Sequence, residues 1–387
     1  MARAGTFVVQ TLEEETVVGT GYAGVRPRDY AEGGRTSLER FFKSVPLLSL
    51  ARPHPTVFVL RVTDTLPHAL AVLGEHGFLS TPVLNQANAT VGMVSVNDLA
   101  SALVVMADVV ATEATGPDGD AAVQQRLREM WAAHTVGQVL DISGRSPFVP
   151  LPHTASVWDA LERLGRDGAH SVVVMKEDGS GPEALYSQAA VLAYLFHHLP
   201  HFRVIARKMV QQVGNFSQQV GAHKPLHVAE DAPLLEAFRL LRDQAVTGVM
   251  VLSHGRKLIG VISATDVRML GAHMERGDRL FSSAGAFVHK VQKQNPLLLS
   301  KVVSCTPVDT VGMVMEKMLD NAVHRVFVVR THHGIATRAL RSLCLCAAFG
   351  VAILVSDHPS RNIGMEEEVP LDVLAMRDIL LLFQPEA

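Results

Sequence analysis

Three aspartates of this 387-residue chain share one local setting. Asp98, Asp266 and Asp378 each follow a short apolar run that ends in small or polar residues, and each opens a second apolar run. An ionised carboxylate has two oxygens that accept hydrogen bonds, so at a strand-to-helix junction it can hold both hydroxyls of a ribose. Aspartate is also a favoured helix N-cap. The residues alone therefore leave ribose binding and helix capping as alternatives.

A second candidate for chemistry is the pair His324-Arg325, which begins a β-rich run. Arginine offers a planar fork of donors suited to phosphate, and histidine adds one or two more. A solvated pair at a strand edge is the alternative interpretation. His170 occupies the matching place in an earlier stretch, but Ser171 follows it and Ala190 stands where the other stretches have aspartate. We expect His170 to reach a phosphate without a ribose ligand beside it.

The elements that position these residues recur along the chain. Four copies of one unit are visible, each a helix, two β-rich runs divided by a turn, and a second helix. Polar N-cap residues open the helices. The period is about 76 residues, with insertions at residues 111–125 and near residues 331–370. The later insertion is either an excursion that packs on the protein or on a partner, or a gene-sequence error such as a retained intron.

Composition limits the class of protein. A hydrophobic content of 48% and a charged content of 19% exclude wholesale disorder. The net charge of −3 gives no bulk attraction to nucleic acid or to an anionic membrane. We expect no signal peptide, because the first residues lack an apolar core. We also expect no membrane span, because the longest apolar run, residues 343–355, is shorter than the roughly 20 residues that a span needs.

The unit resembles the cystathionine β-synthase (CBS) domain, a nucleotide-binding module, over roughly residues 38–383. The resemblance implies an α/β fold of four CBS repeats that form two paired (Bateman) modules in a pseudo-symmetric disc. We predict a mobile N-terminal tail at residues 1–37, a first pair at 38–200 and a second pair at 201–387. The four repeats are expected near residues 45–110, 135–200, 222–275 and 296–383.

Several stretches resemble more specifically the γ regulatory subunits of AMP-activated protein kinase, those of plant type most of all. They are residues 41–47, residues 302–306 and residues 323–329, together with the missing aspartate of the second repeat. The resemblance implies a regulatory chain without catalysis, adenine nucleotides (AMP, ADP or ATP) as ligands, no metal, and a catalytic α and a scaffold β subunit as partners. The nucleotide-binding residues that it implies are Asp98, Thr247, Ser263, Ala264, Thr265, Asp266, Asp378, His170, His324 and Arg325. Ser171 and Ala375 depart from the family pattern.

Other classes of function stay open. The chain could be a stand-alone CBS protein that binds adenosyl ligands and regulates another enzyme or a transporter. An enzyme with a CBS insert is a third class, but nothing outside the repeats could hold its catalytic barrel. Cys344, Cys346 and the histidines around them match no common zinc spacing, so we expect no metal. Three cysteines make no disulfide framework, which favours a reducing compartment, the cytoplasm or the nucleus.

Overall fold

Four small sheets organise the protein, one from each repeat. The computed structural model describes residues 34–51, 56–113, 119–213, 226–246, 248–255, 258–294, 303–328 and 372–383. Within these residues every sheet has three strands in the order in which they follow along the chain. The first strand pairs in parallel with the second, and the second pairs antiparallel with the third. Each repeat therefore runs strand, helix, strand, strand, helix.

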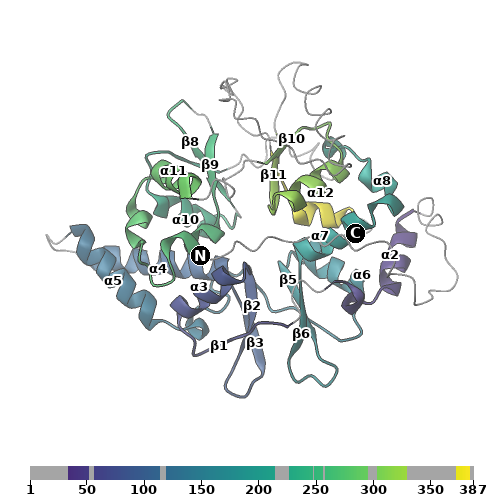
Figure 1. The fold of residues 1–387 in the computed structure, drawn as a ribbon, viewed down its shortest axis with the longest axis horizontal. Helices are drawn as coiled ribbons and strands as arrows, with labels where there is room; N and C mark the ends of the chain where they lie inside the picture. Colours follow the sequence, from purple (N-terminus) through teal and green to yellow (C-terminus); the bar gives the residue numbers. More distant parts are fainter. Residues whose placement is uncertain are drawn as a thin grey trace.

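The first two repeats occupy the lower half of Figure 1. Repeat 1 consists of β1 (Leu60–Arg61), α3 (Leu66–Glu75), β2 (Ser80–Leu84), β3 (Thr90–Ser95) and α4 (Val96–Glu113). Repeat 2 consists of β4 (Pro150–Leu151), α6 (Val157–Leu161) with η3 (Glu162–Arg166), β5 (Ser171–Met175), β6 (Pro182–Ser187) and α7 (Gln188–His197). Outside the repeats lie α2 (Gly34–Ser44), η1 (Leu47–Ser49), α5 (Gly119–Ala133) and η2 (Val136–Gln138).

The last two repeats form the upper half of the same view. Repeat 3 consists of β7 (His227–Ala229), α10 (Leu234–Asp243), β8 (Val249–Leu252), β9 (Leu258–Ile262) and η6 (Ala264–Leu270). Repeat 4 consists of β10 (Ser304–Cys305), α12 (Val311–Asp320), β11 (Arg325–Val328), β12 (Asp372–Ala375) and α14 (Met376–Leu381). The connecting segments are η4 (Leu199–His201), α8 (Arg203–Ala206), η5 (Val210–Gln212), η7 (Gly277–Phe281) and α11 (Ala284–Gln294).

Polar caps begin the helices largely as the sequence predicts. The hydroxyls of Thr65, Ser156 and Thr310 accept main-chain N–H groups of the first turns of α3, α6 and α12. Such a bond satisfies one of the donors that a helix start leaves without an intrahelical partner. In repeat 3 the cap is Pro233, which makes no side-chain bond. Local chemistry thus sets the start of three of these four helices.

Three features differ from the sequence-based expectation. A short first strand opens every repeat, but two or three residues are too few to show a period of two. Asp266 lies within η6, a 3-10 segment that ends at Leu270 and is followed by Gly271 with φ of 84°. The helix α2 begins at Gly34, inside the predicted tail. Residues 1–33 and the insertion predicted at 331–370 lie outside the described residues.

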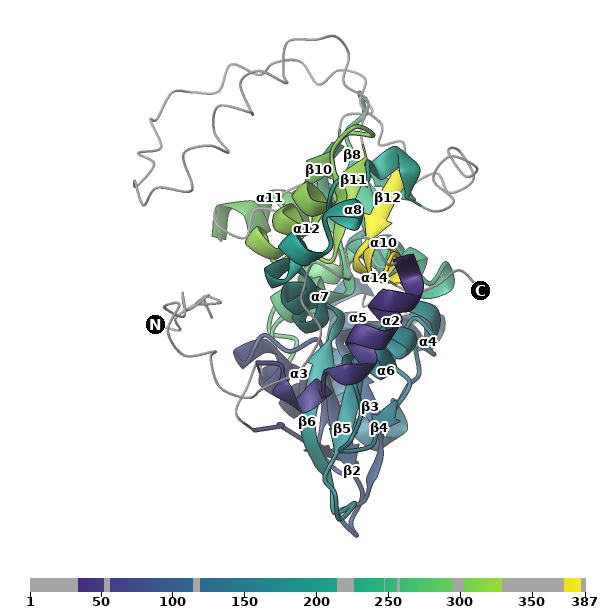
Figure 2. The same ribbon diagram turned by 90° about the vertical axis from the view of Figure 1, so that its right-hand side faces the viewer.

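Two hydrophobic cores join the repeats across the two halves of the chain. One core combines α3, α4 and α5 with α10, η6 and α11, so it unites repeats 1 and 3. The other combines α2, α6 and α7 with α12 and α14, so it unites repeats 2 and 4. Figure 1 shows these as the left and right sides of the body, and Figure 2 shows the narrower profile of a disc.

Contacts between sheets join the two repeats within each half of the chain. The hydroxyls of Ser80 in β2 and Ser171 in β5 lie 3.0 Å apart and are buried, which joins repeats 1 and 2. Met250, Leu252 and Phe327 form a small apolar cluster that joins repeats 3 and 4. Each repeat therefore contacts one neighbour through helices and another through its sheet. None of the described helices is both long enough and apolar enough to cross a lipid bilayer.

Candidate functional site

Five basic side chains from three parts of the chain influence one another electrostatically, and we call them the positive cluster. They are Arg145, His170, His324, Arg325 and Arg377. The first follows repeat 1, the second precedes β5 of repeat 2, and the other three belong to repeat 4. Three of the five side chains are arginines, whose like charges are costly to hold close together unless an anion offsets them. The cluster is therefore a natural place for phosphate.

Both histidines of the cluster are enclosed by protein. Burial lowers the pKa of His170 to about 4, and the charges of neighbouring arginines add to this effect. Burial likewise lowers the pKa of His324 to about 4, with further contributions from Arg325 and His170. Both residues are half-buried. At neutral pH the two rings are uncharged, and each can donate one hydrogen bond to a phosphate oxygen.

Arg325 lies at the start of β11, and its guanidinium rests on the backbone of Gly248. A β-carbon at residue 248 would overlap the guanidinium, so glycine is needed there for close approach. Burial lowers the pKa of Arg325 to about 10, and the carboxylate of Asp266 opposes that change. The side chain therefore stays charged at neutral pH. Among the described residues, no hydrogen bond or ion pair involves the side chains of His170, His324 or Arg325.

The carboxylate of Asp266 interacts electrostatically with Arg325 of this cluster. Its Oδ2 accepts hydrogen bonds from the N–H and the hydroxyl of Ser263, at 2.7 and 3.1 Å. Its Oδ1 accepts no hydrogen bond from the described residues. Burial raises the pKa of Asp266, while Ser263, Arg325 and Arg268 act in the opposite direction. The carboxylate thus serves the local turn with one oxygen and leaves the other for a ligand.

Asp98 is placed quite differently, although its sequence setting is the same. It is fully buried, and its Oδ2 accepts the N–H and the hydroxyl of Ser95 at 2.8 and 2.7 Å. Its Oδ1 accepts the N–H and the hydroxyl of Ser143 at 3.0 and 2.6 Å. A carboxylate has about four acceptor positions, and here the protein fills all four. Burial raises the pKa of Asp98, and these bonds oppose the rise.

The other predicted residues fall into two groups. Ser263, Ala264 and Thr265 lie directly beside Asp266, and the hydroxyls of Ser263 and Thr265 are 2.6 Å apart. Asp378 is half-buried in the first turn of α14. Thr247 lies outside the described residues, as do the metal candidates around Cys344. Within the described residues, no group of three or more histidines, cysteines or carboxylates could hold a metal ion.

Ser171 explains why the second repeat has no arginine after its histidine. Its side chain is buried against Ser80 where the sheets of repeats 1 and 2 meet. An arginine at this position would need room and partners that the contact does not offer. Ser171 thus packs between two repeats, and His170 enters the cluster without a neighbouring arginine.

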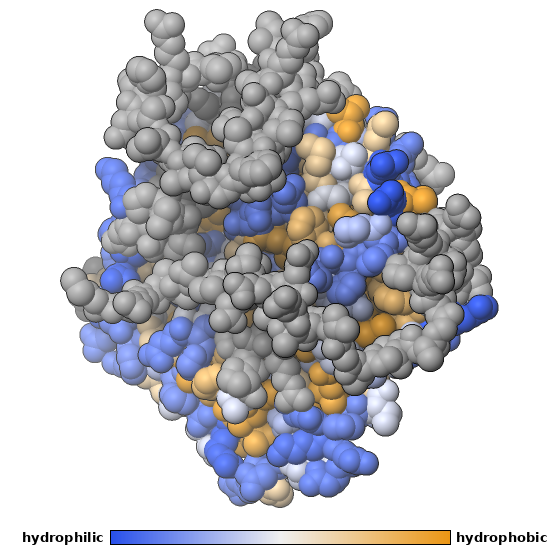
Figure 3. All heavy atoms as spheres, turned by 45° about the vertical axis from the view of Figure 1, so that its right-hand side comes forward, coloured by the Kyte–Doolittle hydropathy of each residue, from blue (hydrophilic) through white to orange (hydrophobic). Residues whose placement is uncertain are grey.

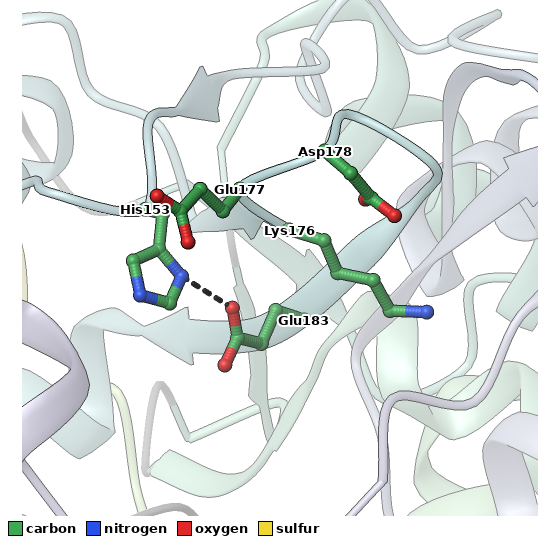
Figure 4. A pocket seen from close by; sticks show the side chains of 5 residues that line it. All are labelled: His153, Lys176, Glu177, Asp178 and Glu183. Carbon is green, nitrogen blue, oxygen red and sulfur yellow. Dashed lines mark hydrogen bonds and ion pairs between the residues drawn. The ribbon is translucent and has the colours of Figure 1, made fainter.

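A separate surface pocket lies beside the strands of repeat 2, and none of the predicted residues lines it. Its lining residues are His153, Lys176, Glu177, Asp178 and Glu183. Figure 4 shows the ring of His153 directed at Glu183, with Nδ1 and Oε2 2.7 Å apart, while Lys176 and Asp178 point elsewhere. Three carboxylates against one lysine disfavour a phosphate. This pocket does not fit the expected ligand.

Sequence patterns missed three residues of the site. Arg145 belongs to no motif, and Arg377 stands beside Asp378 in the repeated pattern but was not among the predicted ligands. Arg377 donates to the carbonyls of Gly165 and Arg166, at 2.8 and 3.1 Å, so part of its guanidinium is already engaged. Gly248 was the one detectable signal, because a glycine at a strand start often marks a close approach of another group.

Comparison with known proteins supports the repeat assignment. The CBS domain family model matches residues 50–105 and 218–272, which lie in the first and third repeats. A solved structure from Methanocaldococcus jannaschii, described as a proposed archaeal homologue of γ-AMPK, superposes with a TM-score of 0.58. The match covers 88% of this chain and 100% of the other at 14% identity, so it concerns the fold alone. The chain thus carries CBS domains arranged as in paired CBS proteins.

Curated relatives of similar sequence carry another name. "Protein SDS23" of Meyerozyma guilliermondii is 22% identical over 357 residues, which is 84% of this chain and 65% of that protein. "Protein sds23" of Aspergillus niger is 28% identical over 133 residues, or 34% of this chain and 26% of the relative. The chain therefore spans less than two thirds of either relative. Neither relative is named as a plant-type γ subunit, so the finer resemblance finds no support in these two.

Proposed function

We propose that this protein is a non-catalytic regulatory chain that senses adenine nucleotides through the site formed by Asp266 and the positive cluster. One observation carries the proposal. His170, His324 and Arg325 come from two repeats, lie half-buried, and make no side-chain hydrogen bond within the described residues. Half-buried donors without protein partners are open to water or to a ligand, and their basic character favours an anion as that ligand. Asp266, with one free oxygen, supplies the complementary ribose contact.

The site would distinguish its ligands by the number of phosphate groups that they carry. The carboxylate of Asp266 accepts from sugar hydroxyls, whereas Arg325 and the two histidines donate to phosphate oxygens. AMP, ADP and ATP differ in the number of these oxygens. A nucleotide can bias a partner only as far as it binds the partner's two states with different affinity. Regulation would therefore follow from differences in contact with the positive cluster.

The finer proposal is a γ-type subunit of a heterotrimeric protein kinase, with catalytic α and scaffold β subunits as partners, in the cytoplasm or the nucleus. The superposition of the four-repeat fold on the structure from Methanocaldococcus jannaschii supports it. The two curated relatives are not named as kinase subunits, so the second candidate is a CBS protein that acts without a kinase and regulates another protein. Co-purification of kinase α and β subunits with the tagged chain supports the first candidate, and purification without them supports the second.

The nucleotide proposal is tested by Arg325→Gln. Glutamine keeps hydrogen-bonding ability and removes the charge. We expect AMP to bind at least about tenfold more weakly, which is about 1.4 kcal/mol, and adenosine to bind as before. Calorimetric titration of the full chain with AMP and adenosine measures both affinities. Equal loss for the two ligands would indicate a distorted site, and unchanged AMP affinity would contradict the proposal.

A further inference from the structure

The turn at residues 141–146 is built around the carboxylate of Asp98. Ser143 donates its N–H and its hydroxyl to Oδ1 of Asp98. The hydroxyl of Ser146 donates to that of Ser95 at 2.5 Å, and Ser95 holds the other oxygen. The N–H of Ser146 donates to Oδ1 of Asp141 at 3.1 Å, which closes the turn on itself. The buried aspartate therefore fixes the shape and place of this turn.

Arg145 extends from this turn into repeat 3. Its main-chain N–H donates to the hydroxyl of Ser143 at 3.2 Å, so the same serine that binds Asp98 also holds the backbone of Arg145. At its other end, Nη1 donates to the carbonyl of Val246 at 2.8 Å. Val246 precedes Gly248 by two residues, and the guanidinium of Arg325 rests on Gly248. Arg145, from the segment between repeats 1 and 2, and Arg325 of repeat 4 thus meet one short segment of repeat 3.

Most of the donors of Arg145 remain available. A guanidinium has five N–H groups, and the bond to Val246 is the only one that Arg145 makes through its side chain to the described residues. The side chain is half-buried, and burial lowers its pKa while Asp98 opposes that change. Arg145 in turn contributes to lowering the pKa of both His170 and Arg325. Its charge therefore acts on the place where the phosphate is proposed to bind.

We propose that Arg145 is a further phosphate-binding residue of this site, and that Asp98 positions it through Ser143 instead of holding a ribose. The inference rests on the proposed nucleotide-binding function. It gives the first aspartate a different role from Asp266, because the protein already fills its acceptor positions. With Asp98 as a positioning residue, every one of the four repeats contributes to the anion site. A purely structural tie between repeats 1 and 3 is the competing explanation for the bond to Val246.

The test measures AMP and adenosine affinity by calorimetry for Arg145→Gln, Ser143→Ala and the double variant, with Arg325→Gln as the reference. We expect Arg145→Gln to weaken AMP at least about tenfold and adenosine less than about twofold. Ser143→Ala should weaken AMP about threefold, because the turn is held less firmly. The double variant should bind AMP no more weakly than Arg145→Gln alone, since Ser143 acts through Arg145. Combining Ser143→Ala with Arg325→Gln should multiply the two effects.

The outcomes separate this inference from the proposed function. If Arg325→Gln weakens AMP and Arg145→Gln does not, Arg145 is a structural tie and only the inference fails. If neither variant changes AMP affinity, both fail. Equal weakening of AMP and adenosine by Arg145→Gln would also overturn the phosphate role. Thermal unfolding of each variant without ligand checks the fold. Should Arg145→Gln not fold, Arg145→Lys carries the test, with AMP weakened and adenosine unchanged as the expected result.

Discussion

Acidification from pH 7 to pH 5 should destabilise this protein through the two histidines of the positive cluster. The ordinary pKa of a histidine is 6.5, and in the fold the pKa of His170 and of His324 is about 4. Between these values the unfolded chain binds a proton on each ring that the folded chain does not bind. The contribution of the two uncharged rings to folding stability is therefore fully present above about pH 6.5 and is lost as the pH falls toward about 4.

The size of the loss follows from the same values. At pH 5 an unfolded histidine is almost fully protonated, whereas a ring with a pKa of about 4 is protonated to roughly a tenth. Integrating this difference gives about 2 kcal/mol of lost stability for each ring at pH 5. Well below pH 4, where the ring is protonated in both states, the lost stability would reach about 3.4 kcal/mol for each histidine. These figures are large beside a typical domain stability of about 5–15 kcal/mol.

Urea unfolding at pH 7, 6 and 5 measures the effect, with the fluorescence of the buried Trp131 and Trp158 as the signal. The informative comparison is wild type against His324→Asn at each pH. Asp98 and Asp266 have raised pKa values and act in the opposite sense, but their contribution cancels in this difference. We expect the fall in stability between pH 7 and pH 5 to be smaller by about 2 kcal/mol in the variant.

One result would refute this reasoning. If His324→Asn and wild type lose the same stability between pH 7 and pH 5, the ring titrates as a solvated histidine does. The enclosed positive cluster would then not exist in solution. A His170→Asn variant and the double variant with His324→Asn show whether the two rings act independently. If they do, the double variant should lose both contributions to the pH dependence of stability.

Two further predictions concern the ligand site. Asp266→Ala should weaken AMP binding by about 1.5–3 kcal/mol in calorimetry, the scale of hydrogen bonds to a charged group, and unchanged affinity in a folded variant would remove the ribose role. Gly248→Ala should weaken AMP at least about tenfold, because a β-carbon at residue 248 displaces the guanidinium of Arg325. Gly74→Ala is the matched control: it lies within α3 with open space around it, so it should raise stability by about 0.5–1 kcal/mol in thermal unfolding and leave AMP affinity unchanged.

The sequence alone was sufficient for the repeated unit and for the place of its aspartates. Both depend on local information: the apolar period of helices and strands, the polar caps, and the recurrence of one pattern. His324 and Arg325 were also identifiable, because a basic pair at a strand start is visible in the chain. The short first strands were not, since two residues carry no periodicity.

Only the tertiary structure separated residues with identical local settings. Asp98 and Asp266 read alike along the chain, but Ser143 fills the free oxygen of the first and no described residue fills that of the second. Arg145 and Arg325 are 180 positions apart, and only the packing of four repeats brings both to the segment around Gly248. Hydrogen-bond partners and charge neighbours of this kind arise from long-range contacts. A linear pattern cannot encode them, because the two members of each contact lie in different repeats.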